Sequence, residues 1–278
     1  MDRRDGAHTK SFMRLLVKTV AYSFFYGINL CMRFLFLRRE ISVLMYHSVE
    51  DGAWKYGVGT EMFRRQLAYL KKKYHIVPLR DVVAFMKKGI ELPDKTVALT
   101  FDDGYTDAYE TVFPLIREFS IPITVFLTTN LEKKWGGLER LTWEQVREMH
   151  KSDLVSFEAH GHDHINLAEA SSDIGMLTRE LGACRDAIFQ NLGYKVRYIA
   201  YAAGHKNSAV MGFVKDVGFE AAFSISEGLI KKEGNPYAIK RTQVDRTMSF
   251  FLFRARLTGA VDLNRKFIDF FRNAYEKK

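Results

Sequence analysis

From residue 41 onward, short apolar runs of strand type alternate with segments whose apolar residues recur at helical spacing. The runs predict strands, and the segments between them predict helices. We expect strands at 41–46, 96–101, 122–128, 153–159, 196–201 and 219–224, and helices at 61–73, 81–88, 106–119, 142–150, 171–190 and 208–217. Repeated strand–helix units predict an α/β fold with a mostly parallel sheet, either open or closed into a barrel.

Nothing in the chain divides this pattern into smaller units. A length of 278 residues is compatible with one large α/β domain or two smaller ones, and no internal repeat or low-complexity linker separates two halves. The composition, with 47% hydrophobic and 27% charged residues, is that of a globular protein. We therefore expect a basic and hydrophobic N-terminal segment at 1–39, followed by one domain at 40–278.

Polar residues that can take part in chemistry follow four of the predicted strands. They are the pair Asp102 and Asp103, then His160, His47 and Tyr201. In parallel α/β folds, ligands gather at the carboxyl ends of the strands. The sequence therefore predicts that these side chains face one common site.

The first of these groups is the pair Asp102 and Asp103, which precedes Gly104. An Asp-Asp-Gly triplet also occurs in plain turns, because Asp and Gly are common turn residues. At the end of a strand, however, adjacent side chains point in different directions. One carboxylate can then bind a metal ion while its neighbour stays free to accept a proton.

The second group is His160 and His164, which are four residues apart. Either one helical turn or a tight loop would bring both imidazoles to one ion, with His162 facing away. The alternative is a solvated histidine-rich loop with adventitious metal affinity. Together with Asp103, the set would be two imidazoles and one carboxylate with open coordination positions. That is the arrangement of a catalytic metal site and predicts metal-assisted hydrolysis.

The charge and cysteine content limit the partners. A formal net charge of +9 favours anionic partners. The basic residues are spread through the chain without the interleaved aromatic residues of a single-strand or RNA binder, so nucleic acid is not expected. Only two cysteines, Cys31 and Cys184, occur, and they imply neither a disulfide framework nor a zinc knuckle.

An apolar stretch at residues 19–37 is long enough to cross a bilayer. Asn29 and Arg33 interrupt it, basic residues flank it on both sides, and no signal-peptide cleavage site is visible. Three interpretations stay open: a membrane-spanning signal anchor, an interfacial helix among the lipid head groups, and a core or dimer helix. We expect association with a membrane surface, and the sequence does not say on which side.

Two motifs carry a resemblance to a known family. The string Thr100–Tyr105, followed by His160 and His164, resembles the polysaccharide deacetylase family, also called the NodB-homology domain or carbohydrate esterase family 4. The similarity extends over roughly residues 41–260 and includes the opening Leu44–Val49 and the helix at Phe63–Leu67. It implies a distorted (β/α) barrel that removes N-acetyl or O-acetyl groups from sugars with the help of a divalent metal.

The resemblance also implies residue roles. Asp103, His160 and His164 would hold the metal, which is usually zinc and in some members cobalt or nickel. Asp102 would be the general base. A backbone N–H near Ala203 would stabilise the tetrahedral oxyanion.

The proton donor to the leaving amine follows less directly. Many family members use a histidine near the C-terminus, but this chain has none after His205. We expect His47 to take that role, because the branch that opens with Tyr-His places its acid there. Arg241 matches a position that could lie near the base carboxylate, and a solvated surface arginine is the alternative.

Three departures from the family pattern affect the expected site. Gly161 stands where Ser or Thr is usual, and Ile165 stands where proline is usual. The third motif reads Ile199–Gly204 and lacks the usual proline and second aromatic residue, which removes a wall of the acetyl pocket. A larger acyl group, a different sugar or weak activity could follow.

The predicted function is a membrane-associated, metal-dependent hydrolase that removes acetyl groups, by expectation N-acetyl groups, from a glycan or a lipid-linked sugar. Two alternatives stay open. One is a non-catalytic glycan-binding relative that keeps the metal site, and the other is a metal-dependent amidohydrolase acting on a non-sugar amide.

Overall fold

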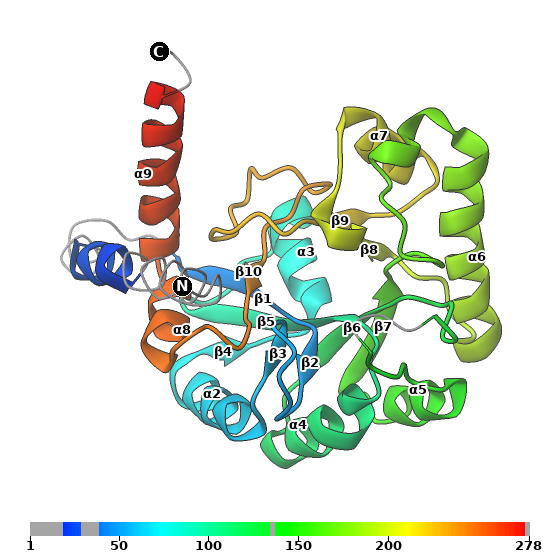
Figure 1. The fold of residues 1–278 in the computed structure, drawn as a ribbon, viewed down its shortest axis with the longest axis horizontal. Coiled ribbons are helices and arrows are strands. Elements are labelled where there is room, and N and C mark those ends of the chain that lie inside the picture. The colour runs from blue at the N-terminus through cyan, green and yellow to red at the C-terminus, as the bar shows by residue number, and fades with distance from the viewer. Residues whose placement is uncertain (1–18, 29–38, 134–136, 276–278) are drawn as a thin grey trace, which may run out of the picture.

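The computed structural model of the chain describes residues 19–28, 39–133 and 137–275, with side chains described as far as residue 269. Its main sheet has eight strands in the order β10-β1-β5-β6-β7-β8-β9, with β4 pairing on β5 (Figure 1). The strands are β1 (Ile41–Tyr46), β4 (His75–Ile76), β5 (Thr96–Asp103), β6 (Ile123–Leu127), β7 (Val155–Ala159), β8 (Tyr198–Ala200), β9 (Ala221–Phe223) and β10 (Thr242–Gln243).

All of the strand pairings in this sheet are parallel. The sheet is strongly curled. Most of the helices lie around its outside, whereas α3 (Leu79–Lys88) packs on the inner face (Figure 1). The helices are α2 (Thr60–Lys73), α3 (Leu79–Lys88), α4 (Phe113–Phe119), α5 (Trp143–His150), α6 (Ile174–Leu192), α7 (Ser208–Asp216), α8 (Phe250–Arg256) and α9 (Ala260–Tyr275). The predicted α/β fold, a distorted (β/α) barrel, is confirmed.

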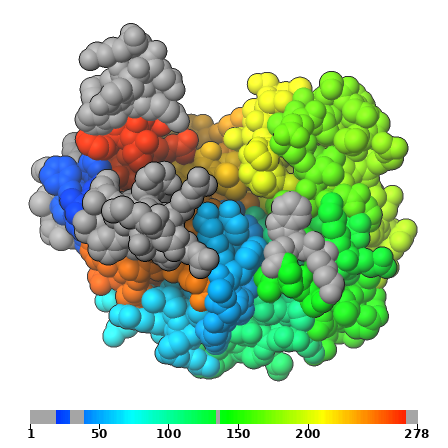
Figure 2. Space-filling view, viewed as in Figure 1, coloured from blue at the N-terminus to red at the C-terminus, as the bar shows by residue number. Residues whose placement is uncertain are grey.

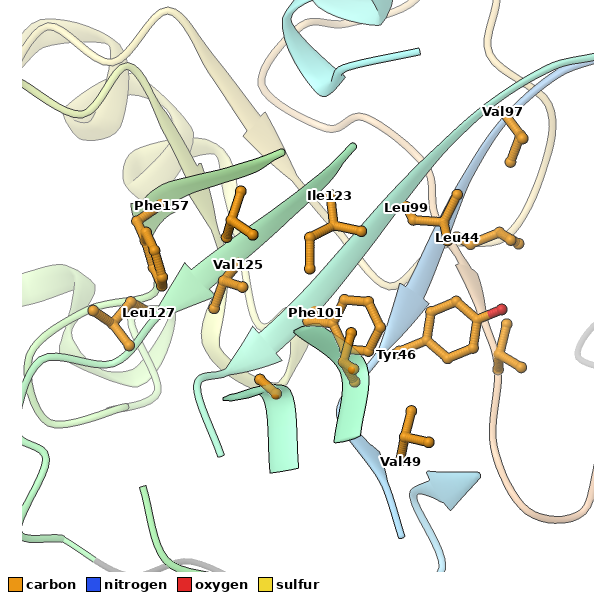
Figure 3. Packing of buried hydrophobic residues seen from close by; sticks show 14 of the residues in the cluster. Leu44, Tyr46, Val49, Val97, Leu99, Phe101, Ile123, Val125, Leu127 and Phe157 are labelled. Atoms are coloured by element: carbon orange, nitrogen blue, oxygen red, sulfur yellow. The ribbon is translucent and has the colours of Figure 1, made fainter. Parts of the chain in front are cut away.

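The central strands are buried over their whole length, which explains why they read as continuous apolar runs. Every residue of β1 and of β5 is buried. Side chains alternate between the two faces of a strand, so Leu99 and Phe101 of β5 pack with Leu44 and Tyr46 of β1 (Figure 3). Parallel strands covered on both faces show this pattern.

The other face of β5 is directed into the curl of the sheet and carries the chemistry. Ala98 packs there with Val43 and Phe126 in a second apolar cluster. Because the side-chain period is two, Thr100 and Asp102 lie on the same face as Ala98. Alternation therefore puts Asp102 on the inner face, and its place near the end of β5 puts it beside the segments that follow the strands.

Local signals place several helix ends. Thr142 caps α5 in a capping box with Gln145. Asp173 caps α6, whose last turn is followed by Gly193 in the left-handed conformation. Pro114 restarts the predicted helix at 106–119: a π-helical segment, Ala108–Val112, runs into α4 at this point.

Residues 19–28 form a helix that packs against α8 and α9 (Figure 1). Tyr22 and Phe25 are buried there, and the ring of Phe25 lies 5.5 Å from that of Phe267. The rest of the predicted apolar stretch, at 29–37, lies outside the described residues. Among the described helices, none is long and apolar enough to span a bilayer.

Candidate active site and metal centre

Asp102 lies at the end of β5 and is paired with Arg241 by two hydrogen bonds. The guanidinium donates from Nη1 to Oδ1 at 2.6 Å and from Nη2 to Oδ2 at 2.7 Å. Arg241 is fully buried, and its Nε donates to the carbonyl of Ser224 at 3.1 Å. Bidentate pairs of this type fix both the position and the orientation of a carboxylate. Arg241 thus lies in the site and not on the surface.

This pairing controls the charge of Asp102. Burial by itself would raise the pKa of the carboxyl group, but the positive charge of Arg241 and the proximity of His160 and His47 outweigh burial and hold the pKa at about 2. Asp102 is therefore ionised at neutral pH. A buried carboxylate that keeps its charge is ready to accept a proton.

Asp103 turns away from Arg241 and toward the two histidines. Its Oδ1 lies 3.6 Å from Nε2 of His160 and 3.3 Å from Nε2 of His164. One ligand atom from each of these three residues lies within 4.8 Å of the other two. Oδ1 of Asp103 is buried and has no hydrogen-bond partner among the described residues. The three atoms converge on a space that a cation would occupy.

The donor set fits a divalent metal ion. Nδ1 of His160 lies 2.9 Å from the carbonyl oxygen of Ala200, so Nδ1 carries the proton and Nε2 keeps its lone pair. Burial lowers the pKa of His160 to about 4, against the opposing effect of Asp102 and Asp103, so the imidazole is neutral. Two imidazole nitrogens and one carboxylate oxygen suit zinc, cobalt or nickel and leave coordination positions for water and substrate.

The histidines reach this point through a loop and not through a helical turn. His160 directly follows β7, which ends at Ala159, and residues 161–164 continue the loop. His164 has a positive φ of 56°, which is uncommon for a residue other than glycine. His162 faces away, as expected, with its Nδ1 2.9 Å from the hydroxyl of Thr129.

His47 directly follows β1. Its ring is half-buried beside Trp54 and Tyr56, with ring centroids 6.2 and 5.4 Å away. Nδ1 of His47 is buried and lacks a hydrogen-bond partner within the described part of the chain. His47 is thus near enough to affect the charge of Asp102 and has a ring nitrogen available for another partner.

The third motif lies at the end of β8. Ala203 has a left-handed backbone (φ 49°, ψ 15°) in a short turn, Ala202–Gly204, that follows the strand. Ala200, three residues earlier, accepts the hydrogen bond from His160, so this turn is tied to the metal ligands. Tyr201 does not join the site by its hydroxyl, which donates to the carbonyl of Tyr237 at 3.0 Å.

Sequence reasoning missed Arg140, which is buried beside Asp103. Its Nη1 donates to the backbone carbonyl of Asp103, and its guanidinium stacks over Tyr105 at 5.1 Å. Arg140 lies outside every predicted strand and in no motif, so no sequence signal marks it. It holds the backbone of Asp103, whose φ is 74°.

The site combines an aspartate pair at the end of one strand of a curled parallel sheet with an H-x3-H loop after another. The resemblance noted in the sequence implies a carbohydrate deacetylase. The comparisons agree. The family model described as polysaccharide deacetylase matches residues 89–222. Over these residues, the chain is similar to the polysaccharide deacetylase family.

Individual relatives cover most of the domain. The poly-beta-1,6-N-acetyl-D-glucosamine N-deacetylase of Staphylococcus aureus is 28% identical over 195 residues, which are 67% of each chain. The solved structure of IcaB from Ammonifex degensii superposes with a TM-score of 0.71 at 25% identity, covering 79% of this chain and 96% of that one. The deacetylase PplD of Streptococcus pyogenes, at 24% identity, shares the fold with a TM-score of 0.69, covering 78% and 97%.

Proposed function

We propose that this protein is a metal-dependent hydrolase that removes N-acetyl groups from a glycan of N-acetylated amino sugars, either free or lipid-linked. One observation carries the proposal: an ionised carboxylate fixed by an arginine lies directly beside three convergent metal-binding atoms. The named activity of the Staphylococcus aureus relative supports the choice of substrate class.

Each residue of the site has a role in this reaction. When bound by Asp103, His160 and His164, a divalent ion would supply Lewis-acid polarisation of the acetyl carbonyl and of the attacking water. Asp102 accepts the proton of that water, and Arg241 keeps the carboxylate charged and oriented.

The two remaining roles concern the collapse of the intermediate. A backbone N–H at the turn near Ala203 donates to the oxyanion that forms from the acetyl oxygen. His47 gives a proton to the departing amine nitrogen of the sugar, because an unprotonated amide nitrogen is a poor leaving group.

The test is acetate release from a panel of β-1,6-linked and β-1,4-linked N-acetylglucosamine oligomers. The protein is first treated with a chelator and then assayed alone and with Zn²⁺, Co²⁺ or Ni²⁺. We expect release that depends on the metal and disappears in Asp102→Asn. Glycan binding and metal binding without acetate release from any substrate would instead favour a non-catalytic glycan-binding protein. Release from simple acetylated amines but not from sugars would favour a non-sugar amidohydrolase.

We also propose that one corner of the molecule lies on an anionic lipid surface. Five exposed apolar side chains, Val20, Phe24, Phe251, Phe267 and Ile268, come from the helix at 19–28 and from α8 and α9. These segments meet at that corner (Figure 2). Exposed apolar residues gathered in one place are typical of interfacial attachment, and the net charge of +9 favours anionic head groups.

Vesicle flotation tests this placement. The protein is expected to float with phosphatidylglycerol vesicles and to remain behind with phosphatidylcholine vesicles. The double variant Val20→Ser, Phe24→Ser should lose flotation while keeping acetate release from soluble oligomers. Equal flotation of the variant and the parent protein would contradict the proposal.

A further inference from the structure

Glu180 is a buried carboxylate on a helix face that is otherwise apolar. It lies in α6 between Leu177, Leu181 and Cys184, all of which belong to the core. Only 5% of Glu180 is exposed. A carboxylate buried in this way is costly unless hydrogen-bond donors satisfy it.

The donors that satisfy Glu180 are backbone N–H groups of the metal-binding loop. The N–H of Asp163 donates to both carboxylate oxygens at 3.0 Å, and the N–H of Ile165 lies 3.5 Å from Oε1. These two residues flank His164 on either side. Ile165 can contact Glu180 in this way because, unlike a proline, it has an N–H.

The loop needs such support because its backbone is strained at His164. A positive φ is unfavourable outside glycine and persists only when the surroundings hold it. On its other side, Asn130 donates to Oδ1 of Asp163 at 2.6 Å and Lys133 donates to the carbonyl of Asp163 at 2.7 Å. Glu180 and these two residues therefore hold the loop through separate hydrogen bonds.

Gly161 provides the room for this carboxylate. A Cβ atom placed on Gly161 would lie 2.4 Å from Oε1 of Glu180, which is closer than any normal contact. Gly161 also has a φ of +88°, a conformation that favours glycine. The carboxylate of Glu180 can therefore occupy this position only because residue 161 has no side chain.

We propose that Glu180 is a positioning residue for the metal site: by holding the N–H groups on both sides of His164, it keeps the imidazole aimed at the ion and sets the affinity for the metal. The inference rests on the proposed function, since it requires a divalent ion held by Asp103, His160 and His164. Glu180 itself acts only through the backbone.

The experiment measures the dissociation constant for Zn²⁺ and Co²⁺ by competition with a chromophoric chelator. Groups that orient metal ligands typically contribute 10- to 100-fold to metal affinity. We expect Glu180→Ala to weaken binding by about that factor, and Glu180→Gln by less, because its amide oxygen still accepts one N–H. The matched control is Asp186→Asn, an exposed acid on the same helix, which should change the constant by less than about twofold.

Two further readouts separate positioning from a general loss of structure. Acetate release by Glu180→Ala should recover when the metal concentration is raised, with an unchanged KM for the sugar, whereas a misfolded variant would not recover. Gly161→Ala should also weaken metal binding, and adding Glu180→Ala to it should cost less than the sum of the two single changes, because they disturb one contact.

The outcomes distinguish the two proposals. Tight binding by the parent protein together with unchanged binding by both Glu180 variants would overturn the positioning role alone. Two results would overturn the proposed metal site and the positioning role with it. One is that the parent protein binds neither ion, and the other is that the Asp103→Asn variant binds the ions as tightly as the parent protein.

Discussion

Two sides of the candidate site differ in how completely their polar atoms are paired. On the base side, both oxygens of Asp102 are occupied by Arg241, which also contacts Thr100. On the open side, buried atoms of Asp103, His47 and Arg140 have no hydrogen-bond partner within the residues that the structure describes: Oδ1, Nδ1 and Nη2, respectively. These unpaired atoms are themselves buried, so contact with solvent does not explain the difference.

This difference in pairing indicates that the two sides of the site have different chemical roles. Buried polar groups are almost always paired, so a cluster of unpaired ones marks the place where a ligand supplies the partners. The base side is complete in advance, which keeps a charge ready without reorganisation. In the proposed function, the ion at Asp103 and the substrate at His47 would supply the partners that the open side lacks.

The largest effects are expected when the negative charges of Asp102 and Asp103 are removed one at a time. Asp102→Asn is expected to lower kcat by about 10²- to 10⁴-fold with metal content unchanged, because only the base is lost. Asp103→Asn should lose the metal as well as activity. Metal analysis of the purified, metal-loaded variants and acetate release together check both. Loss of metal from Asp102→Asn would mean that the two sides are not separate.

The second prediction concerns the stability of the base side. Arg241→Met leaves Asp102 buried without its counter-charge, and removing one partner of a buried pair costs about 3–5 kcal/mol. The free energy of unfolding from urea titration should fall by that amount, and Asp102→Asn in the same chain should restore part of it. The control is Arg197→Met, whose pair with Glu220 is partly exposed and should cost no more than about 1 kcal/mol.

The strands and part of the candidate site could be predicted from the sequence. The strands were predictable because a parallel sheet buried on both faces needs continuous apolar runs, and β1 and β5 have them. The proximity of Asp103 to His160 and His164 followed from strand ends meeting at one edge. Strand alternation further implies that Asp102 and Asp103 face different neighbours.

The supporting residues were beyond this reasoning. Arg140 and Glu180 reach the site from a loop and from a helix face, and their burial depends on packing across distant parts of the chain. Arg241 was ambiguous between a site residue and a solvated one, because a lone arginine before a short edge strand has no periodic pattern around it. The periodicity of a sequence indicates which face of a helix or strand is buried. It does not indicate which buried polar group will form a hydrogen bond with a residue from a distant segment.

A third prediction sharpens the comparison with Asp107, a carboxyl group that lies beside the segment following His47. Burial raises the pKa of Asp107 from 3.8 to about 6, although the N–H of Val49, which donates to it at 2.6 Å, opposes the rise. Since the folded pKa lies above the unfolded one, the contribution of Asp107 to stability is complete below about pH 4 and is lost as the pH rises through 6.

At about 1.4 kcal/mol per pKa unit, the loss is at most about 3 kcal/mol. The measurement is the free energy of unfolding from urea titrations between pH 4 and pH 7. Asp107→Asn, which cannot titrate, should flatten this part of the profile. A decline of the same size in Asp107→Asn would assign the pH dependence to another group.

The smallest expected effect, about 10²-fold, tests whether His47 is the proton donor of the open side. His47→Gln keeps a polar side chain of similar length but cannot donate an acidic proton to the departing amine. kcat for an N-acetylated oligomer should fall by about that factor while metal content stays unchanged. A leaving group that needs no proton removes the requirement for the acid. On p-nitrophenyl acetate, the variant should therefore lose no more than a few-fold, because p-nitrophenolate departs unassisted. An equal loss on both substrates would place His47 in binding or in support of the metal site, and the unpaired Nδ1 would need another explanation.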